Sequence, residues 1–272
     1  MRADQLLVER GLAASRSQAV RLIAGGLRWR DAGSTDAWRP VGKNRDDIPE
    51  TAELDLADAA ESRFVSRGGL KLEGALATAG IDARGRHCLD IGQSTGGFTD
   101  CLLQHGAAHV VGIDVGHGQL HARIREDERV TAIERVNARA LTRADLPEDE
   151  RAEFDLVVGD LSFISQTLVL PAVVPFLAPG GDLLMLVKPQ FELQPGQVGK
   201  GGIVRDAALY AVVEARLREA CAALGLRVAR WFDSPIAGGD GNREFFIHAV
   251  SATGRDDGVP DPGAAHAHSP EL

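Results

Sequence analysis

From residue 67 onward, short apolar runs of strand length alternate with amphipathic stretches of helical spacing. The runs that we expect to be strands cover residues 87–92, 110–115, 130–134, 155–161, 182–188, 227–232 and 244–250. The longest helical pattern covers residues 206–224, just before the last two strands. Apolar strands that alternate with helices are typical of a doubly wound, mostly parallel sheet with helices on both faces. The pattern therefore predicts an α/β domain over residues 67–250.

Residues 1–60 follow a different pattern, in which two short helices precede the strands. Apolar residues recur at helical spacing over residues 6–23, with glycines where each helix is expected to end. Short strands are expected at 27–30 and 54–56, on either side of a polar, turn-rich stretch. These residues are therefore expected to form a small α+β module.

Two segments carry little apolar pattern. Residues 61–66 are expected to link the small module to the α/β domain. Residues 251–272 are rich in Gly, Pro, Ala and Asp, and we expect them to form a disordered tail because they offer little apolar surface to bury.

Charge is distributed unevenly along the chain. The whole chain carries a formal charge of −9, which argues against a protein that coats nucleic acid with its entire surface. Within residues 1–45, however, nine basic residues face four acidic ones, a charge of +5, which leaves −14 on the remainder. This asymmetry favours a basic module attached to an acidic body.

Other features of the composition narrow the class of protein. No apolar window approaches the eighteen residues of a membrane span, and the N-terminus lacks the apolar core of a signal peptide. The three cysteines are far apart and form no CxxC motif, which favours a reducing, cytoplasmic setting. His117 and His121 are four residues apart, but no third ligand accompanies them, so no bound metal is expected.

The sharpest local signal is LDIGQSTGGFTD, residues 89–100, which follows the first strand of the α/β domain and begins a helix. Ligands of open parallel sheets bind beyond the carboxyl ends of the strands, and glycines there let the backbone approach a ligand closely. The next strand ends at Asp114, whose carboxylate can accept both ribose hydroxyls of a nucleoside. The loop is therefore predicted to bind a cofactor that contains a nucleoside.

Two classes of cofactor share this geometry. A nicotinamide dinucleotide requires G-x-G-x-x-G, with its pyrophosphate at the helix N-terminus, but here Ser94 occupies the position of the second glycine. S-adenosylmethionine has no phosphate and carries a sulfonium cation, so the acidic residue before the loop, Asp90, suits it. The pattern favours S-adenosylmethionine, while an ordinary tight turn between strand and helix is the structural alternative.

Charged residues at other element ends are further candidates. Asp160 and Lys188 end the fourth and fifth strands, although Asp160 could instead cap a helix over 163–175 and Lys188 could be a solvated charge. Lys71 near the start of a helix and Glu244 at the start of the last strand are equally compatible with exposed surface charges. The residues alone leave these alternatives open.

With these segments considered together, the chain resembles the hemolysin A/TlyA family of ribosomal RNA ribose 2′-O-methyltransferases over residues 1 to about 250. The resemblance rests on RADQLLVERGLAASRSQA, SRGGLKL, DIGQSTGGFTD, GIDVGHGQL, DLSFIS, VKPQFE, GKGGIVRD and SPIAGGDGNREFF, in this order. It implies an S4-type RNA-binding domain over residues 1–60. It also implies a Rossmann-like methyltransferase domain over residues 67–250, similar to the FtsJ ribose methyltransferases.

The resemblance also implies a reaction and a set of residues. Ribosomal RNA within ribosomal subunits would be methylated on a ribose, that of cytidine, by S-adenosylmethionine. A Lys-Asp-Lys-Glu tetrad would be formed by Lys71, Asp160, Lys188 and Glu244. Lys188 would lie against the 2′-hydroxyl, either as a cation that stabilises the alkoxide or, if neutral, as a general base. Asp160 would orient Lys188, and Glu244 would hold Lys71 or the ribose.

Further residues are implied for binding. The donor pocket would include Asp90, Gly92, Ser94, Thr95, Gly96, Gly97, Phe98, Asp114, Asn137 and Ala138. The small module would contact phosphates through Arg2, Arg16, Ser17 and Arg21.

Two positions depart from the family pattern. Gln93 stands where a small residue such as Ala is usual, so its side chain could crowd the donor or add a hydrogen bond. Arg28-Trp29-Arg30 stands where apolar β-branched residues are usual. The competing hypotheses are an RNA- or ribosome-binding protein with a vestigial methyltransferase fold, and a nicotinamide-dependent oxidoreductase. A pore is not expected, because the chain shows neither a span nor an export signal.

Overall fold

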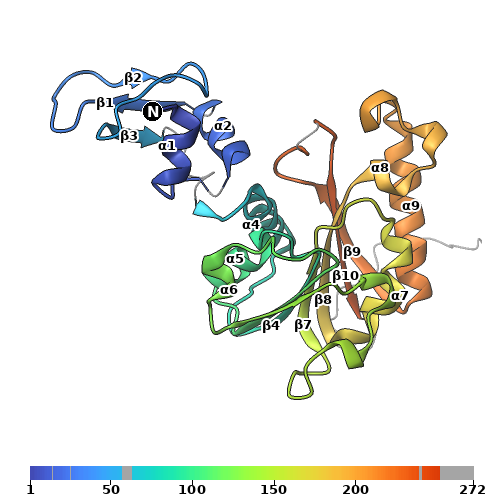
Figure 1. Cartoon of the computed structure of the whole chain (residues 1–272). Coiled ribbons are helices and arrows are strands. Elements are labelled where there is room, and N and C mark those ends of the chain that lie inside the picture. The colour runs from blue at the N-terminus through green and yellow to red at the C-terminus, as the bar shows by residue number, and fades with distance from the viewer. Residues whose placement is uncertain (14, 25, 57–62, 239–240, 252–272) are drawn as a thin grey trace, which may run out of the picture.

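The computed structural model describes residues 1–13, 15–24, 26–56, 63–238 and 241–251, which form a small N-terminal module and a larger α/β domain (Figure 1). The module contains helices α1 (Ala3–Glu9) and α2 (Arg16–Ala24) and strands β1 (Leu27–Arg30), β2 (Arg39–Pro40) and β3 (Glu53–Leu56). Its antiparallel sheet has the order β2-β1-β3, and leucines of both helices are buried in the same core, together with Ile23 of α2. The two predicted helices are thus confirmed, as are the two predicted strands, which correspond to β1 and β3.

The larger domain is built on one seven-stranded sheet of order β6-β5-β4-β7-β8-β10-β9. Its strands are β4 (His87–Ile91), β5 (His109–Asp114), β6 (Val130–Glu134), β7 (Phe154–Gly159), β8 (Leu177–Val187), β9 (Leu226–Asp233) and β10 (Phe245–Ser251). The five strands β6, β5, β4, β7 and β8 are parallel to one another, whereas β10 is antiparallel to both of its neighbours, β8 and β9. The predicted mostly parallel sheet is therefore confirmed.

The strand order reverses between β4 and β7, because β5 and β6 extend the sheet to one side and β7 and β8 to the other. In open α/β sheets this reversal leaves a crevice beyond the carboxyl ends of the two central strands. The loops that follow Ile91 and Gly159 meet there. The fold thus brings the glycine-rich segment and Asp160 to the same point.

Helices cover both faces of the large sheet (Figure 1). One face carries α4 (Arg67–Ala79), α5 (Gly97–Gln104) and α6 (Ala122–Arg125), and the other carries α7 (Leu170–Val173) and α9 (Ala208–Ala223). Helix α8 (Pro189–Glu192) follows the carboxyl end of β8. Short 3₁₀ helices occur at Ala138–Ala140, Arg143–Asp145, Gln166–Leu168, Val174–Phe176, Pro195–Gln197 and Lys200–Gly202.

The structure corrects two expected boundaries. Phe64 and Val65 were expected in a linker over residues 61–66. Both side chains are instead buried in the core with residues of α4 and α5, so the packed core of the α/β domain extends at least to Phe64. Residues 61 and 62 lie outside the described part. The single helix considered for 163–175 is instead a 3₁₀ turn, the short helix α7 and a second 3₁₀ turn. Of the expected disordered tail, Ser251 ends β10 and the rest lies outside the described residues.

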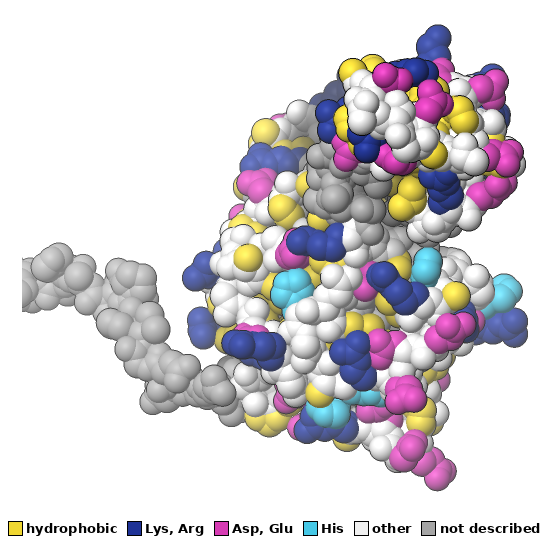
Figure 2. Space-filling model, turned by 90° about the vertical axis from the view of Figure 1, so that its left-hand side faces the viewer, with side chains coloured by type: hydrophobic (Ala, Val, Ile, Leu, Met, Phe, Trp, Pro, Cys, Tyr) yellow, Lys and Arg dark blue, Asp and Glu magenta, His cyan; other side chains and the backbone are white. Residues whose placement is uncertain are grey.

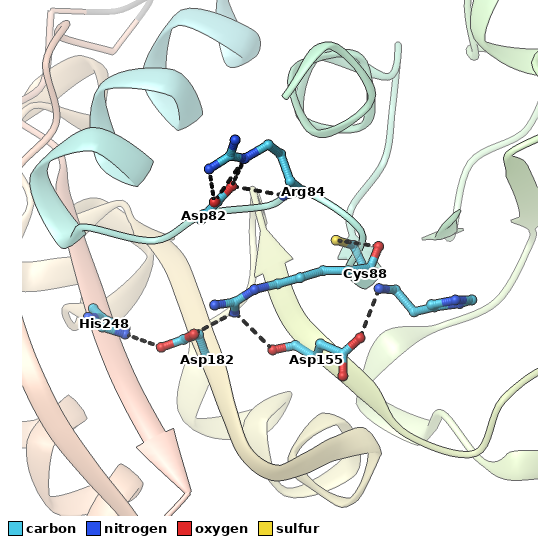
Figure 3. A network of polar contacts seen from close by, with 8 residues as sticks. Asp82, Arg84, Cys88, Asp155, Asp182 and His248 are labelled. Carbon is cyan, nitrogen blue, oxygen red and sulfur yellow. Dashed lines mark hydrogen bonds and ion pairs between the residues drawn. The ribbon is translucent and has the colours of Figure 1, made fainter. Parts of the chain in front are cut away.

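A polar network joins the amino-terminal ends of the central strands, at the edge opposite the crevice (Figure 3). Asp182 of β8 accepts hydrogen bonds from Nε2 of His248 at 2.7 Å and from Nη1 of Arg86 at 2.6 Å. Asp155 of β7 accepts the backbone N–H of His87, at the start of β4, at 3.0 Å. The network therefore holds β4, β7, β8 and β10 together at the edge that carries none of the predicted catalytic residues.

Candidate active site

The loop between β4 and α5 has the backbone that its glycines predict. Gly92 and Gly96 have φ of 84° and 92°, in the left-handed region that favours glycine. A Cβ added at Gly92 would lie 2.9 Å from the backbone oxygen of Asp160, so the glycine permits close approach to the end of β7. The N–H of Gly92 donates to the carbonyl of Ile113 at 2.8 Å, which fixes the loop against β5 as well.

Asp114, at the carboxyl end of β5, is bound to this loop. Its Oδ2 accepts the backbone N–H of Ser94 at 2.7 Å, and its Oδ1 accepts that of Gly116 at 2.7 Å. Each carboxylate oxygen has a second lone pair, so both can still accept a hydroxyl. Asp114 therefore positions the loop and remains able to hold the ribose of a ligand.

A cavity of about 480 Å³ opens between the loop and the ends of β5, β6 and β7. Among the predicted donor-binding residues, Gly92, Ser94, Asp114, Asn137 and Ala138 line it, together with Asp160. Asn137 accepts the N–H of Arg139 at 3.0 Å and so caps the 3₁₀ helix that begins at Ala138. Apolar side chains from several elements complete the wall. The volume and this mixed lining are typical of a small-molecule site.

A second cavity of about 140 Å³ adjoins the first, and the two share Gly92, Ser94, Asp160 and Ser162. It is lined in addition by Thr95, Gly97, Phe98 and Lys188. Gly97 also permits tight packing, because an added Cβ would lie 2.0 Å from Oγ of Ser66. Eight of the ten predicted donor residues thus line two adjoining cavities, and Asp160 lines both of them.

Two of the predicted donor residues line neither cavity. Gly96 precedes α5 and lies against Leu120 and Ile124. Asp90 is fully buried beneath the loop, where its Oδ2 accepts a hydrogen bond from Oγ1 of Thr99 at 2.7 Å. Burial raises the pKa of this carboxyl to about 7. Asp90 thus supports the loop from below.

The four residues of the predicted tetrad form two ion pairs at the carboxyl edge of the sheet. Nζ of Lys188 lies 2.5 Å from Oδ1 of Asp160 and donates to Oγ of Ser162 at 2.8 Å. Nζ of Lys71 in α4 lies 2.5 Å from Oε2 of Glu244, next to the start of β10. Segments far apart in the sequence therefore supply each pair.

These contacts decide between the two interpretations of the tetrad residues, which the sequence left open as functional groups or as a helix cap and exposed surface charges. The side chain of Lys188 is only 13% exposed, so it is not a solvated surface charge. Asp160 pairs with Lys188, and Ser165 caps the 3₁₀ helix that follows. Lys71 and Glu244 are both buried against each other. Burial raises the pKa of Glu244, whereas the nearby Lys71 acts in the opposite direction.

Two residues at this site were missed by the sequence reasoning. Ser162 accepts the hydrogen bond from Lys188, and the signal in the sequence was a polar side chain two positions after Asp160. Phe163 is 89% exposed with φ of 65°, and its ring lies 5.0 Å from that of Phe191. A bulky residue in the left-handed region is strained, and such strain clusters at functional sites. An exposed aromatic side chain thus stands at the edge of the larger cavity.

The predicted phosphate contacts of the N-terminal module are only partly described. Arg2 is bound to the buried Asp4, with Nη2 2.6 Å from Oδ2, so its charge is balanced within the module. Arg16 is exposed at the start of α2. Ser17 and Arg21 follow in α2, but their side chains lie outside the described part of the structure.

The folded module is less basic than its first 45 residues. Residues 46–56 add five acidic residues and no basic one, so residues 1–56 contain nine of each. Arg28 and Arg30 of β1 pair with Asp55 and Glu53 of β3. Figure 2 shows acidic and basic side chains intermingled over the module at the top of the view. Because the module has no net charge over residues 1–56, any contact with nucleic acid must depend on local groups of basic side chains and not on an overall positive charge.

The unusual Arg28-Trp29-Arg30 strand is accommodated by side-chain stacking. The guanidinium of Arg39 lies 4.9 Å from the ring centre of Trp29, and that of Arg30 lies 4.4 Å from that of Trp38. Cation–π contacts of this kind contribute about 0.5–1 kcal/mol at exposed sites. The polar strand is therefore compatible with a packed hairpin.

Within the described residues, no group of three or more His, Cys, Asp or Glu side chains is placed to hold a metal ion. No helix in the same part of the chain is long and apolar enough to cross a membrane.

Comparison with known proteins identifies relatives over nearly the whole chain. The family model for FtsJ-like methyltransferases matches residues 64–250. The 16S/23S rRNA (cytidine-2′-O)-methyltransferase TlyA of Mycobacterium tuberculosis is 44% identical over 95% of both chains. The candidate rRNA methyltransferase YqxC of Bacillus subtilis is 45% identical over 91% of this chain and 84% of its own. A candidate hemolysin of Streptococcus thermophilus has a similar solved structure, with a TM-score of 0.71 and 38% identity over 93% of this chain and 89% of its own.

Proposed function

The chain belongs to the FtsJ-like methyltransferase family, and from that membership we propose that it methylates the ribose 2′-hydroxyl of cytidine in ribosomal RNA, with S-adenosylmethionine as donor. The observation that carries the proposal is the Lys188–Asp160 pair at the junction of the two cavities. A relative named for this reaction, 44% identical over 95% of the chain, supports it.

The larger cavity fits the nucleoside part of the donor. Asp114 has lone pairs for the two ribose hydroxyls, and Asn137 and Ala138 border the place expected for the adenine. The smaller cavity extends past the glycine loop toward Lys188. When bound, the donor supplies an electrophilic methyl group on a sulfonium.

Lys188 is the residue proposed to act on the acceptor. Asp160 and Ser162 hold its ammonium at the junction of the cavities, so a ribose hydroxyl placed there meets a fixed cation. In the transfer, the methyl carbon bonds to the hydroxyl oxygen as its bond to sulfur breaks, and the hydroxyl proton passes to water. A fixed cation stabilises the negative charge that develops on the oxygen, and alignment of the two reactants lowers the barrier further.

Lys71 and Glu244 form the second half of the proposed machinery. Their pair is buried beside the first one, and the charges of Lys188 and Asp160 both influence Glu244. We assign this pair to holding the target ribose near Lys188. Phe163 is proposed to stack on the target base, because unstacked RNA bases bind exposed aromatic rings.

The N-terminal module is proposed to be an S4-type domain that positions the enzyme on ribosomal subunits in the cytoplasm. Arg2, Arg16, Ser17 and Arg21 remain the proposed phosphate contacts, with Arg16 the exposed cation among those described. Because the module is neutral as a whole, we expect it to contribute a few well-placed contacts and not a broad electrostatic attraction.

The direct test uses ribosomal subunits from cells that lack the protein, together with methyl-labelled S-adenosylmethionine. We expect label in the RNA with the purified protein and background label with Lys188→Ala. Calorimetric titration with the donor and with NAD accompanies the assay. Donor binding without transfer to any ribosomal RNA would favour an RNA-binding protein with a vestigial fold, and NAD binding without donor binding would favour an oxidoreductase.

A further inference from the structure

The side chain of Gln93 does not point into the donor cavity as a crowding group. It is 5% exposed and folds back beneath the glycine loop, where its Nε2 donates to Oγ1 of Thr99 at 2.9 Å. Thr99 in turn donates to Oδ2 of Asp90 at 2.7 Å. Gln93 thus begins a chain of three polar side chains inside the layer between the sheet and α5.

Gly112 of β5 provides the space for this arrangement. It pairs in register with Asp90 of β4, so a side chain at Gly112 would point to the same face of the sheet as that of Asp90. A Cβ added there would lie 2.0 Å from both Cδ and Nε2 of Gln93. Glycine inside a strand weakens it and often marks a close approach, which here is the amide of Gln93.

The backbone at Gln93 transmits the position of its side chain to the cavity walls. Its carbonyl accepts the N–H of Gly96 at 2.8 Å, and its own N–H donates to the carbonyl of Ile113 at 3.2 Å. Its neighbours Gly92 and Ser94 line both cavities, and Gln93 itself borders the smaller one. An amide displaced from beneath the loop would therefore disturb the residues that form the donor site.

We propose that Gln93 is a positioning residue for the methyl donor, and that Gly112 is its obligatory steric partner. This inference rests on the proposed function, because its readout is the binding of S-adenosylmethionine. It assigns a specific role to the side chain of Gln93: the amide fills the space above Gly112 and fixes the loop from below.

The test is a double-mutant cycle measured by calorimetric titration of the full chain with S-adenosylmethionine. Gly112→Ala should weaken binding by about tenfold or more, because the added methyl group displaces the amide of Gln93 from beneath the loop. Gln93→Ala should weaken binding only severalfold, because it removes one hydrogen bond and introduces no clash. The double variant should bind within about threefold of Gln93→Ala, since the added methyl group then has room.

Two controls separate positioning from general destabilisation. Gly159→Ala in β7 would place a Cβ 2.4 Å from Cε of Met185, so Gln93→Ala should not restore any loss that it causes. Gln93→Met, of similar length but without the amide, should bind like Gln93→Ala, because it lacks the hydrogen bond to Thr99. Binding of Gln93→Met like the wild type would overturn the role of the amide. Thermal unfolding of every variant measures its folded fraction, so that a loss of binding can be separated from a loss of fold.

The inference is overturned if the double variant binds as weakly as Gly112→Ala or more weakly, because the two positions then act independently. If Gly112→Ala alone does not fold, the comparison of the double variant with Gln93→Ala decides: equal binding supports the contact, and failure of the double variant to fold overturns it. A wild-type chain that binds no donor is a separate result, since it contradicts the proposed function itself.

Discussion

At the scale of single residues, Lys188 and Lys71 make the same kind of contact but differ in what surrounds them. Each ammonium lies 2.5 Å from a carboxylate, but of the two lysines Lys188 alone borders one of the two cavities described above. The charge at each position could be noticed in the sequence, because Asp160 and Lys188 end apolar runs. The pairing could not, because Lys71 and Glu244 are separated by 173 positions and meet only through the fold.

Lys188→Ala is expected to abolish methyl transfer while donor binding stays close to that of the wild type. The interaction removed is with charge that develops only in the transition state, so the loss belongs in the rate. Lys188→Arg should be nearly as damaging, because a guanidinium is bulkier than an ammonium and cannot take the same position between Asp160 and Ser162. Single-turnover assays at saturating RNA and donor measure this, with the exposed Lys200→Ala as control. Rates for both Lys188 variants within about tenfold of wild type, roughly 1.4 kcal/mol, would exclude the assigned role.

Asp90 makes the stability of the domain depend on pH. Burial raises its pKa from 3.8 to about 7, so the folded chain retains a proton that the unfolded chain releases above about pH 4. The stability linked to this proton is fully present below the ordinary pKa and is lost as the pH rises through about 7. Asp90→Asn, which cannot ionise, should therefore gain melting temperature relative to wild type between pH 5 and pH 8. A difference in melting temperature that is constant over this range would contradict the prediction.

At the scale of elements, the sequence predicts strands with a regular apolar pattern, but it does not predict very short strands or buried residues within polar stretches. Strands β1 and β6 match the predicted ranges, because their apolar residues and flanking turns carry the signal. Strand β2 has only two residues, too few for a pattern. Phe64 and Val65 lie in a polar stretch, and their burial depends on α4 and α5, for example through the N–H of Val65, which donates to Asp100 at 2.8 Å.

The network at the amino-terminal edge of the sheet should contribute stability without taking part in the reaction. Burial by itself would raise the pKa of Asp182, but hydrogen bonds from His248 and Arg86 outweigh it and lower the pKa. The stabilisation is therefore present above about pH 4 and is lost as the pH falls through the lowered pKa. Asp182→Asn should cost about 1.5–3 kcal/mol at pH 7, the usual value of hydrogen bonds to charged groups.

Urea unfolding at pH 7 and at pH 3 tests this, and the difference between Asp182→Asn and wild type should shrink at the lower pH. Donor affinity at pH 7 should be unchanged, because the network lies at the opposite edge from the glycine loop. An equal loss of stability at both pH values would show that the carboxylate charge is not what stabilises these strands.

At the scale of the whole molecule, a module and a domain divide the proposed tasks. The sequence predicted the division and the fold of each part, but the apparent basicity of the module depended on where the segment was cut. Two of the acids of residues 46–56, Glu53 and Asp55, become partners of β1 arginines only through the antiparallel register of β1 and β3. Charge counted along a chain therefore did not predict the charge of the folded unit.

A chain that begins at residue 63 should bind S-adenosylmethionine with near wild-type affinity, because every residue that lines the two cavities lies beyond that point. Its methylation of ribosomal subunits should fall to background if the module positions the enzyme. As the salt concentration rises, RNA binding by the full chain should also weaken more steeply than RNA binding by the shortened chain, since phosphate contacts of the module release counterions. Full activity of the shortened chain on ribosomal subunits would show that the module is not the RNA anchor.

The central claim is that the methyl group reaches a ribose hydroxyl through the site at Lys188, and alkaline hydrolysis of the product tests it most directly. Ribosomal RNA is labelled with the protein and methyl-labelled S-adenosylmethionine, then hydrolysed in alkali, which cleaves only after a free 2′-hydroxyl. The account predicts that the label is recovered in alkali-stable dinucleotides with methylated cytidine ribose, and that Lys188→Ala yields none. Label recovered in mononucleotides with methylated bases, or an undiminished yield with Lys188→Ala, would contradict it.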